Sequence, residues 1–280
     1  CVRSDASAMN IATPQAASSW EETRKGLDHG PTFNRMRGTP YYRQAVYEHT
    51  FEASRAMTVH GRGPDMMQIG NELNAGMLWP DGHTFDPPNW DNLAGFLSAG
   101  YAAVKACSPR TQVVLHLAKG GDNGLYRWWF DNITSRGVPF DVIGASYYGY
   151  WHGSLGDLQR NLNDVSAHYG KPVVVLETAY PFTLGFEDAE SNAIGLENQL
   201  VPGYPATPEG QARNFRDVMS IVRAVPNGRG LGVFYWDATW TAVPGNGWDP
   251  TNPASGNTWE NQALFDFDDV ALPAMDEFRR

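Results

Sequence analysis

Five short apolar runs alternate with amphipathic stretches from about residue 65 onward, and this alternation limits the possible fold more than any other feature of the chain. The runs are rich in Val and Ile and apolar on both faces, at 65–72, 112–118, 141–148, 172–178 and 230–237. Strands buried on both faces and separated by helices are typical of βα units in a parallel sheet. We therefore expect an α/β fold, and 280 residues are enough for one large domain of this kind.

The stretches between the runs contain recognisable helix ends. Ser154 and Asp157 are spaced as a capping box, and Gly170 follows as a C-terminal stop. Thr207-Pro208 has the pattern of an N-cap followed by proline in the first helical turn. These signals predict helices that begin near residues 155 and 208.

Two long connections, 181–206 and 238–262, follow the fourth and fifth runs. Both lie after strand C-termini, where a (β/α)8 barrel builds its active site, and long loops in a compact domain are usually functional. Residues 1–40 have no clear period and are expected to be an irregular segment, with 41–280 forming the C-terminal part of a single barrel domain. Forty residues are too few for three further βα units of about 30 residues each, so we expect an incomplete barrel.

Composition limits the partners that the protein is expected to bind. A net charge of −10 argues against nucleic acid and against an anionic membrane surface. The chain has no apolar run of about 20 residues and no signal-peptide pattern at its start. Two cysteines give neither a disulfide framework nor a metal-site spacing. The 10 Trp, 12 Tyr and 13 Phe exceed what a core needs, and exposed rings suit stacking on a neutral sugar.

Two glutamates end the first and fourth runs. Glu72 follows Asn71, and Glu177 ends the run KPVVVLE. On a barrel, strands three positions apart face each other across the mouth, so their terminal side chains can converge. Two carboxyl groups about 5 to 5.5 Å apart suit a retaining glycosidase, and the Asn71 amide suits a sugar 2-hydroxyl. The alternative is that each Glu only caps a helix or satisfies loop amides.

Several segments together resemble glycoside hydrolase family 53, the arabinogalactan endo-β-1,4-galactanases. They are MMQIGNELNAGMLWPDG, VVLHLAKGGD, SYY after FDVIGA, KPVVVLETAYPF, GLGVFYWDATW and ENQALFDFDD. The resemblance runs from about residue 40 to residue 270. It implies a (β/α)8 TIM barrel of the retaining clan, with the five runs as strands four to eight. It also implies an endo-acting enzyme that cleaves β-1,4-galactosidic bonds in arabinogalactan by double displacement.

The resemblance assigns roles to particular residues. It implies that Glu72 is the acid/base, Glu177 the nucleophile and Asn71 a substrate-orienting neighbour. Of the two tyrosines after 141–146, we expect Tyr148 rather than Tyr147 to hydrogen-bond the nucleophile or the sugar, since neighbouring side chains on a strand alternate. Further substrate contacts are expected from His116, Asp122, Trp236 as the floor of the cleaved-sugar subsite, Trp79 and Trp240.

The same resemblance sets the remaining expectations. We expect galactan or galacto-oligosaccharides as substrate, a monomer and a location outside the cell, because polymeric galactan does not cross membranes. We expect no cofactor; some family members bind calcium in the last long loops, but the acidic residues there form no pattern that predicts it.

The chain also departs from the family pattern. An Arg-bearing second strand and a HYSDxWADP segment are missing, and the last strand reads YWDATW where an acidic residue, a proline and an aromatic are usual. Three alternatives therefore stay open. The protein could be another glycosidase of the clan, an inactive truncated homologue that only binds carbohydrate, or an unrelated barrel enzyme in which Glu72 and Glu177 are structural.

Overall fold

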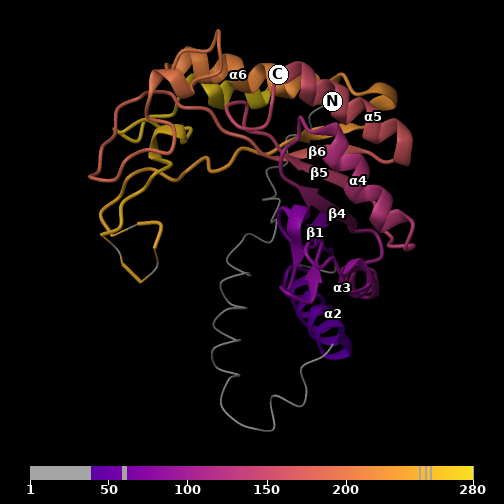
Figure 1. The fold of residues 1–280 in the computed structure, drawn as a ribbon. Coiled ribbons are helices and arrows are strands. Elements are labelled where there is room, and N and C mark those ends of the chain that lie inside the picture. The colour runs from indigo at the N-terminus through magenta and orange to yellow at the C-terminus, as the bar shows by residue number, and fades with distance from the viewer. Residues whose placement is uncertain (1–38, 59–61, 246, 250, 253, 280) are drawn as a thin grey trace. The chain divides into compact units, whose positions relative to one another are not determined.

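The computed structural model describes residues 39–58, 62–245, 247–249, 251–252 and 254–279 (Figure 1). The described chain divides into two compact units. The N-terminal unit contains 39–118 and Gly124–Gly144, and the C-terminal unit contains Lys119–Asn123 and the residues from Ala145 onward. Residues 1–38 of the segment predicted to be irregular lie outside the described residues, and the first described helix begins at Thr39.

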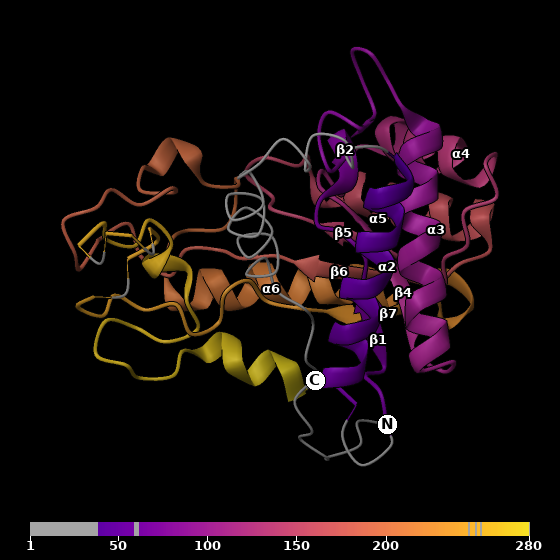
Figure 2. The ribbon, with the colours of Figure 1, turned by 90° about the horizontal axis from the view of Figure 1, so that it is seen from below.

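The N-terminal unit is built around one parallel strand pair. Strand β1 pairs with β4, with Met67 opposite Val113. Helices α2 and α3 pack side by side in this unit (Figures 1 and 2). In chain order its elements are α2 (Thr39–Ala56), β1 (Met66–Gln68), the 3-10 turn η2 (Leu73–Ala75), the antiparallel hairpin β2 (Gly76–Met77) and β3 (Gly82–His83), α3 (Trp90–Cys107), β4 (Gln112–Leu117) and most of α4 (Asn123–Thr134).

The C-terminal unit contains a second parallel pair, β6 with β7, in which Val173 lies opposite Gly230. Its last helical segment packs along α6, as Figure 2 shows. Strand β5 (Val142–Ser146) has its first residues in the N-terminal unit and its last two in this one. The further elements are α5 (Leu155–Tyr169), β6 (Val173–Glu177), η3 (Glu197–Gln199), α6 (Pro208–Arg223), η4 (Pro226–Gly228), β7 (Gly230–Val233), η5 (Glu260–Gln262) and η6 (Pro273–Arg279).

The strand order is β1-β4-β5-β6-β7, and the pairs β1–β4 and β6–β7 are parallel. The predicted α/β fold with a parallel sheet is therefore confirmed. Every residue of β5 is buried, as are all but the first of β4 and all but the last of β6. The prediction that all five strands are buried on both faces is wrong for β7, where Leu231 is 41% exposed. Strand β7 is last in the order and pairs with a neighbouring strand on one edge only.

The helix ends follow the sequence signals closely. Ser154 and Asp157 form the predicted capping box at the start of α5, and Gly170 ends the helix at φ 66°, a left-handed conformation that suits glycine. The Thr207 side chain accepts the Gly210 N–H at the start of α6. Local chemistry thus fixes where both helices begin.

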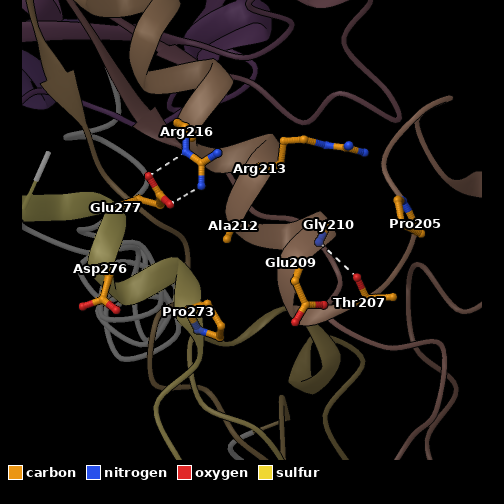
Figure 3. Close-up of a pocket in the computed structure, with 10 residues that line it drawn as sticks. All are labelled: Pro205, Thr207, Glu209, Gly210, Ala212, Arg213, Arg216, Pro273, Asp276 and Glu277. Atoms are coloured by element: carbon orange, nitrogen blue, oxygen red, sulfur yellow. Dashed lines mark hydrogen bonds and ion pairs between the residues drawn. The ribbon is translucent and has the colours of Figure 1, made fainter.

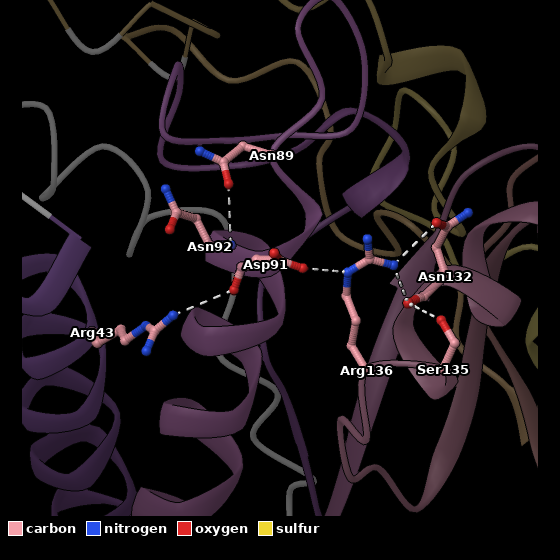
Figure 4. A network of polar contacts seen from close by, with 7 residues as sticks. All are labelled: Arg43, Asn89, Asp91, Asn92, Asn132, Ser135 and Arg136. Atoms are coloured by element: carbon pink, nitrogen blue, oxygen red, sulfur yellow. Dashed lines mark hydrogen bonds and ion pairs between the residues drawn. The ribbon is translucent and has the colours of Figure 1, made fainter.

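A polar network ties α3 to α4 in the N-terminal unit (Figure 4). Arg136 donates from Nε to the Asp91 carboxylate over 2.8 Å and from Nη1 to the Asn132 carbonyl over 3.0 Å. Asp91 lies in the first turn of α3, where a negative charge also favours the helix dipole. Arg43 of α2 reaches the backbone carbonyl of Asp91.

The described helices include none that is both long and apolar enough to cross a lipid bilayer.

Candidate active site

Glu72 lies on a tight turn rather than at the end of a strand. Strand β1 ends at Gln68, and the chain then leaves the sheet through Gly70 at φ 73°. Glu72 has φ 44° and ψ 56°, and it is the N-cap residue of η2. The prediction that Glu72 closes the strand is therefore wrong by four residues, because Gly70 and Glu72 itself both have positive φ and turn the backbone out of the strand.

This turn is anchored to the end of β4 and to α4. The Asn74 side chain donates to the Ala118 carbonyl over 3.2 Å and accepts the Ala118 N–H over 2.8 Å. The fully buried Trp129 indole donates to the Leu73 carbonyl over 2.7 Å. The three hydrogen bonds hold the two residues that follow Glu72, so the backbone that carries its carboxylate is fixed.

Asn71 and His116 contact each other in the same unit. His116 Nδ1 lies 3.0 Å from Asn71 Oδ1, which also accepts a hydrogen bond from Gln68 Nε2. Because Oδ1 is an acceptor, we infer the His116 tautomer with its proton on Nδ1. Burial lowers the pKa of His116 to about 3, so the ring is neutral near pH 7. Asn71 is exposed, and with its oxygen occupied its NH2 group remains to donate to a ligand.

Trp79 lies on the hairpin that follows this turn. Its ring is 57% exposed, and its indole N–H donates to the Ala75 carbonyl over 3.0 Å. The indole nitrogen is thus satisfied within the protein, while much of the ring surface stays accessible. The predicted substrate contact of Trp79 remains a prediction.

In the C-terminal unit, Glu177 is the last residue of β6, as predicted. The Tyr148 hydroxyl donates to Glu177 Oε2 over 3.0 Å, and the Tyr148 side chain is 5% exposed. The neighbouring Tyr147 instead donates to the Gly153 carbonyl over 2.9 Å. The choice of Tyr148 as the hydrogen-bond partner is confirmed, and the role of Glu177 as nucleophile stays a prediction.

Aromatic rings pack around Tyr148, the hydrogen-bond donor to Glu177. The Tyr148 ring lies 5.5 Å from that of Trp259 and 5.9 Å from that of Trp151, both edge-on. The Trp259 indole donates to the Trp236 carbonyl over 2.9 Å. Sequence reasoning missed Trp259, which lies 111 positions along the chain from Tyr148 within a long loop. Trp236 is half-buried and lies beyond the end of β7 at Val233, so the strand is shorter than the run 230–237, and the contact of Trp236 with the cleaved sugar remains a prediction.

A buried hydrogen-bond network lies beneath these rings. The Tyr150 hydroxyl donates to Gln262 Oε1 over 2.7 Å, and the Tyr150 ring stacks on Tyr148 at 5.9 Å. Burial is the main cause that raises the pKa of the Tyr150 hydroxyl well above its usual value, so the group stays protonated as a donor. Gln262 belongs to the polar triplet Glu260–Gln262, the 3-10 turn η5, all of which is buried.

Two predicted residues lie apart from these contacts. Asp122 is exposed, in the turn before α4, and its backbone N–H donates to the Lys119 carbonyl. Trp240 is half-buried, and its carbonyl accepts the Asn257 side chain over 2.7 Å. Neither residue is linked to Glu177 by the hydrogen bonds described above, so their substrate contacts remain predictions.

Several carboxylate oxygens in the described parts of the two long loops accept backbone N–H groups. Asp188 uses both carboxylate oxygens as acceptors, Oδ1 for the Glu190 N–H and Oδ2 for the Asn257 N–H. Glu260 Oε1 accepts the Glu187 N–H over 2.6 Å, and burial raises the pKa of Glu260. Within the described parts of 181–206 and 238–262, three acidic side chains do not converge on one point. We derive no step through a metal there.

A hollow of about 400 Å³ lies between α6 and η6 (Figure 3). An ion pair lies at one side, where Arg216 donates to both Glu277 oxygens over 2.9 and 2.5 Å and Glu277 is 2% exposed. This pair binds the last helical segment to α6. The hollow is lined by Pro205, Thr207, Glu209, Gly210, Ala212, Arg213, Arg216, Pro273, Asp276 and Glu277, a set that contains none of the predicted site residues.

A parallel α/β fold with a Tyr-bound glutamate at a strand end, an Asn-Glu pair after another strand and clustered aromatic rings has the features of a barrel glycoside hydrolase. The comparison with known families agrees. The model of glycosyl hydrolase family 53 matches residues 36–278, and the chain belongs to this family.

The chain is similar to two curated proteins and to one solved structure. A Niallia circulans protein, "Uncharacterized protein in bgaB 5'region", is 42% identical over 231 residues, 80% of this chain and 62% of its own. An arabinogalactan endo-beta-1,4-galactanase from Cellvibrio japonicus is 35% identical over 241 residues, 83% of this chain and 61% of its own. The solved Ignisphaera aggregans GH53 catalytic domain superposes with a TM-score of 0.80 at 42% identity, covering 86% of this chain and 66% of that domain. The chain thus spans about three fifths of the length of these two curated relatives.

Proposed function

We propose that the protein is a retaining, endo-acting glycoside hydrolase that cleaves β-1,4-galactosidic bonds in arabinogalactan. The observation that carries this proposal is the hydrogen bond from Tyr148 to Glu177, which orients a strand-end carboxylate within an aromatic surround. Family membership and the galactanase name of the Cellvibrio relative support the choice of substrate.

The proposed reaction is a double displacement. Ionised Glu177 attacks the anomeric carbon while protonated Glu72 gives its proton to the leaving glycosidic oxygen. The bond from carbon to the leaving oxygen breaks, and a galactosyl ester of Glu177 forms. Glu72, now ionised, removes a proton from water, and the water oxygen displaces Glu177 with retention of configuration. This mechanism requires the two carboxyl groups about 5 to 5.5 Å apart.

The supporting residues then have defined tasks. The Tyr148 hydroxyl favours the ionised form of Glu177, because a donor stabilises a carboxylate more than a carboxylic acid. His116 is held neutral by burial and fixes Asn71, whose NH2 group donates to the sugar 2-hydroxyl. Trp236 forms the apolar floor under the cleaved sugar, while Asp122, Trp79 and Trp240 contact further sugar units.

The remaining assignments are also part of the proposal. Strands β1, β4, β5, β6 and β7 correspond to strands four to eight of a (β/α)8 barrel, so this chain holds an incomplete barrel. The substrate is galactan or its oligosaccharides, which places the enzyme outside the cell, and we propose a monomer. Two carboxyl groups supply all the acid, base and nucleophile chemistry, so the reaction requires no cofactor.

The decisive experiment replaces Glu177 with Gln in the full-length protein. We expect Glu177→Gln to abolish release of reducing ends from galactan while the circular dichroism spectrum is unchanged. Exposed Glu197 lies in the same unit, and Glu197→Gln is the matched control that keeps parental activity. In the parent, a 2-deoxy-2-fluorogalactosyl inactivator should label Glu177, as detected by peptide mass spectrometry.

Other outcomes separate the alternatives. Parental activity in Glu177→Gln would refute the assignment of the nucleophile. Binding of galacto-oligosaccharides without any cleavage by the parent would favour a carbohydrate-binding protein. Faster cleavage of xylan or mannan than of galactan would identify another glycosidase of the clan.

A further inference from the structure

Three aromatic rings form a continuous strip on and beside the β2–β3 hairpin, in which the two outer residues are exposed and the middle one is half-buried. The Trp79 ring lies 5.0 Å from that of His83, and the His83 ring stacks on that of Phe85 at 4.8 Å. Trp79 is 57% exposed and Phe85 is 52% exposed. We name Trp79, His83 and Phe85 the hairpin strip.

The strip is held to the same turn that carries Glu72. The Trp79 indole donates to the Ala75 carbonyl, and the Thr84 N–H donates to that carbonyl over 3.3 Å. The Thr84 hydroxyl donates to the Asn74 carbonyl over 2.7 Å. The backbone N–H of Asn74 in turn donates to the Glu72 carbonyl over 2.8 Å. A few hydrogen bonds therefore connect the strip with the residue proposed as the general acid.

The hairpin itself leaves little room for backbone adjustment. A side chain on Gly76 would place its Cβ 1.8 Å from the Gly82 carbonyl oxygen, and Gly76 has φ 85°. Only glycine permits this close approach of β2 to β3. The rings are therefore presented on a compact support, which lowers the entropy cost of binding to them.

Core packing does not account for the two outer rings. Exposing about half of a Trp and half of a Phe forgoes a large part of the free energy that burial of these rings supplies. Nearby Trp90 and Phe96 of α3, by contrast, are 8% and 0% exposed. Neighbouring exposed aromatic rings are what a saccharide-binding surface requires.

We propose that the hairpin strip is the binding surface for the leaving-group side of the substrate, where it stacks on β-1,4-linked galactose units beyond the cleaved bond. This inference rests on the proposed function. A general acid must contact the oxygen of the leaving group, so a surface anchored to the turn of that acid borders the leaving sugars. The axial O4 of galactose, which carries the glycosidic bond in a β-1,4 chain, leaves the C–H groups at C3, C4 and C5 on one face, and that apolar face fits an aromatic ring.

The test compares two substrates in the full-length protein. Galactotetraose places sugars on both sides of the cleaved bond, whereas an aryl β-galactobioside has an aryl group in place of the leaving sugars. For Phe85→Ala and for Trp79→Ala, we expect kcat/KM to fall at least fivefold more for galactotetraose than for the aryl substrate. The control is Trp128→Ala, an exposed Trp on α4 at 43% exposure, which should change both values by less than twofold.

Two results would overturn the proposal. Equal losses on both substrates would mean that the strip supports Glu72 structurally and does not bind sugar. Unchanged kinetics on galactotetraose would mean that the strip does not contact the chain.

Calorimetric titration with galactotetraose separates this inference from the proposed function. If the parent binds but does not cleave, the hydrolase proposal fails, and a fivefold weaker Kd in Phe85→Ala would still support the strip. If the parent cleaves galactan and Phe85→Ala binds as tightly as the parent, the strip proposal fails alone.

Discussion

Tyr148→Phe is the substitution that tests the site most directly, because it removes one hydroxyl and keeps the ring. The lost interaction is the 3.0 Å hydrogen bond to Glu177 Oε2, made by a side chain that is 5% exposed. Hydrogen bonds to charged groups contribute about 1.5–3 kcal/mol. The packing against Trp259 and Trp151 should survive, since both contacts involve the ring.

The free energy translates into two measurable effects. Loss of 1.5–3 kcal/mol of carboxylate stabilisation moves the acidic limb of the kcat/KM profile to higher pH by about 1 to 2 units. The direction is upward because the hydroxyl donates to the ionised form, so its removal favours protonated Glu177, which is not a nucleophile. At a pH below the new limb, kcat/KM should fall roughly 10- to 100-fold.

The assay is a pH–rate profile on an aryl β-galactobioside, run beside Tyr147→Phe as the control. Tyr147 is 1% exposed and donates to the Gly153 carbonyl, so its variant loses a buried hydrogen bond without touching Glu177. We expect Tyr147→Phe to lower stability by about 1 kcal/mol and to leave the profile in place. A Tyr148→Phe profile lowered equally at every pH, with its limbs unmoved, would refute the reasoning.

Two further predictions concern stability. Burial holds the pKa of His116 near 3, against 6.5 in the unfolded chain, so only the unfolded state binds this proton between those values. The free energy of unfolding therefore falls as the pH drops below 6.5, by about 2 kcal/mol at pH 5. Urea unfolding at pH 7 and at pH 5 should show a smaller difference between the two pH values for His116→Gln than for the parent. An identical difference in the two proteins would contradict this. Arg216→Ala removes the two hydrogen bonds that Arg216 donates to the 2% exposed Glu277 and should cost about 1–3 kcal/mol in urea unfolding. The exposed pair of Arg279 with Asp276 is the control, and Arg279→Ala should lower the free energy of unfolding by less than about 1 kcal/mol. Equal losses in the two variants would show that the Arg216–Glu277 pair contributes no more to stability than an exposed ion pair.

The features that sequence reasoning predicted depend on neighbours along the chain. The capping box of Ser154 and Asp157 involves residues three apart, and the stop at Gly170 depends on the conformational freedom of one residue. Strands β4, β5 and β6 consist mainly of apolar residues, so their burial could be inferred from composition. The hydrogen bond from Tyr148 to Glu177 joins residues far apart in the sequence, and it was expected from the family resemblance together with the alternation of Tyr147 and Tyr148.

The features that it missed depend on distant parts of the chain. Trp259 and Gln262 reach the site from a loop more than 80 positions after Glu177, and no local pattern distinguishes them from other loop residues. The hairpin strip was missed at His83 and Phe85, because ring contacts across a short hairpin leave no periodic signal. The left-handed turn at Glu72 arises from contacts of Asn74 and Leu73 with β4 and α4, which the sequence does not display.

The left-handed backbone conformation of Glu72 lowers the stability of the fold, whereas the proposed catalytic role requires a glutamate at this position. A residue with a Cβ at φ 44° and ψ 56° costs roughly 1–2 kcal/mol, which Gly or Asn would largely avoid. A lineage that no longer needed to cleave its substrate would gain stability by replacing this glutamate. The backbone at this position favours Gly or Asn. A Glu that is kept here therefore distinguishes members of such a lineage that still cleave their substrate from members that only bind it.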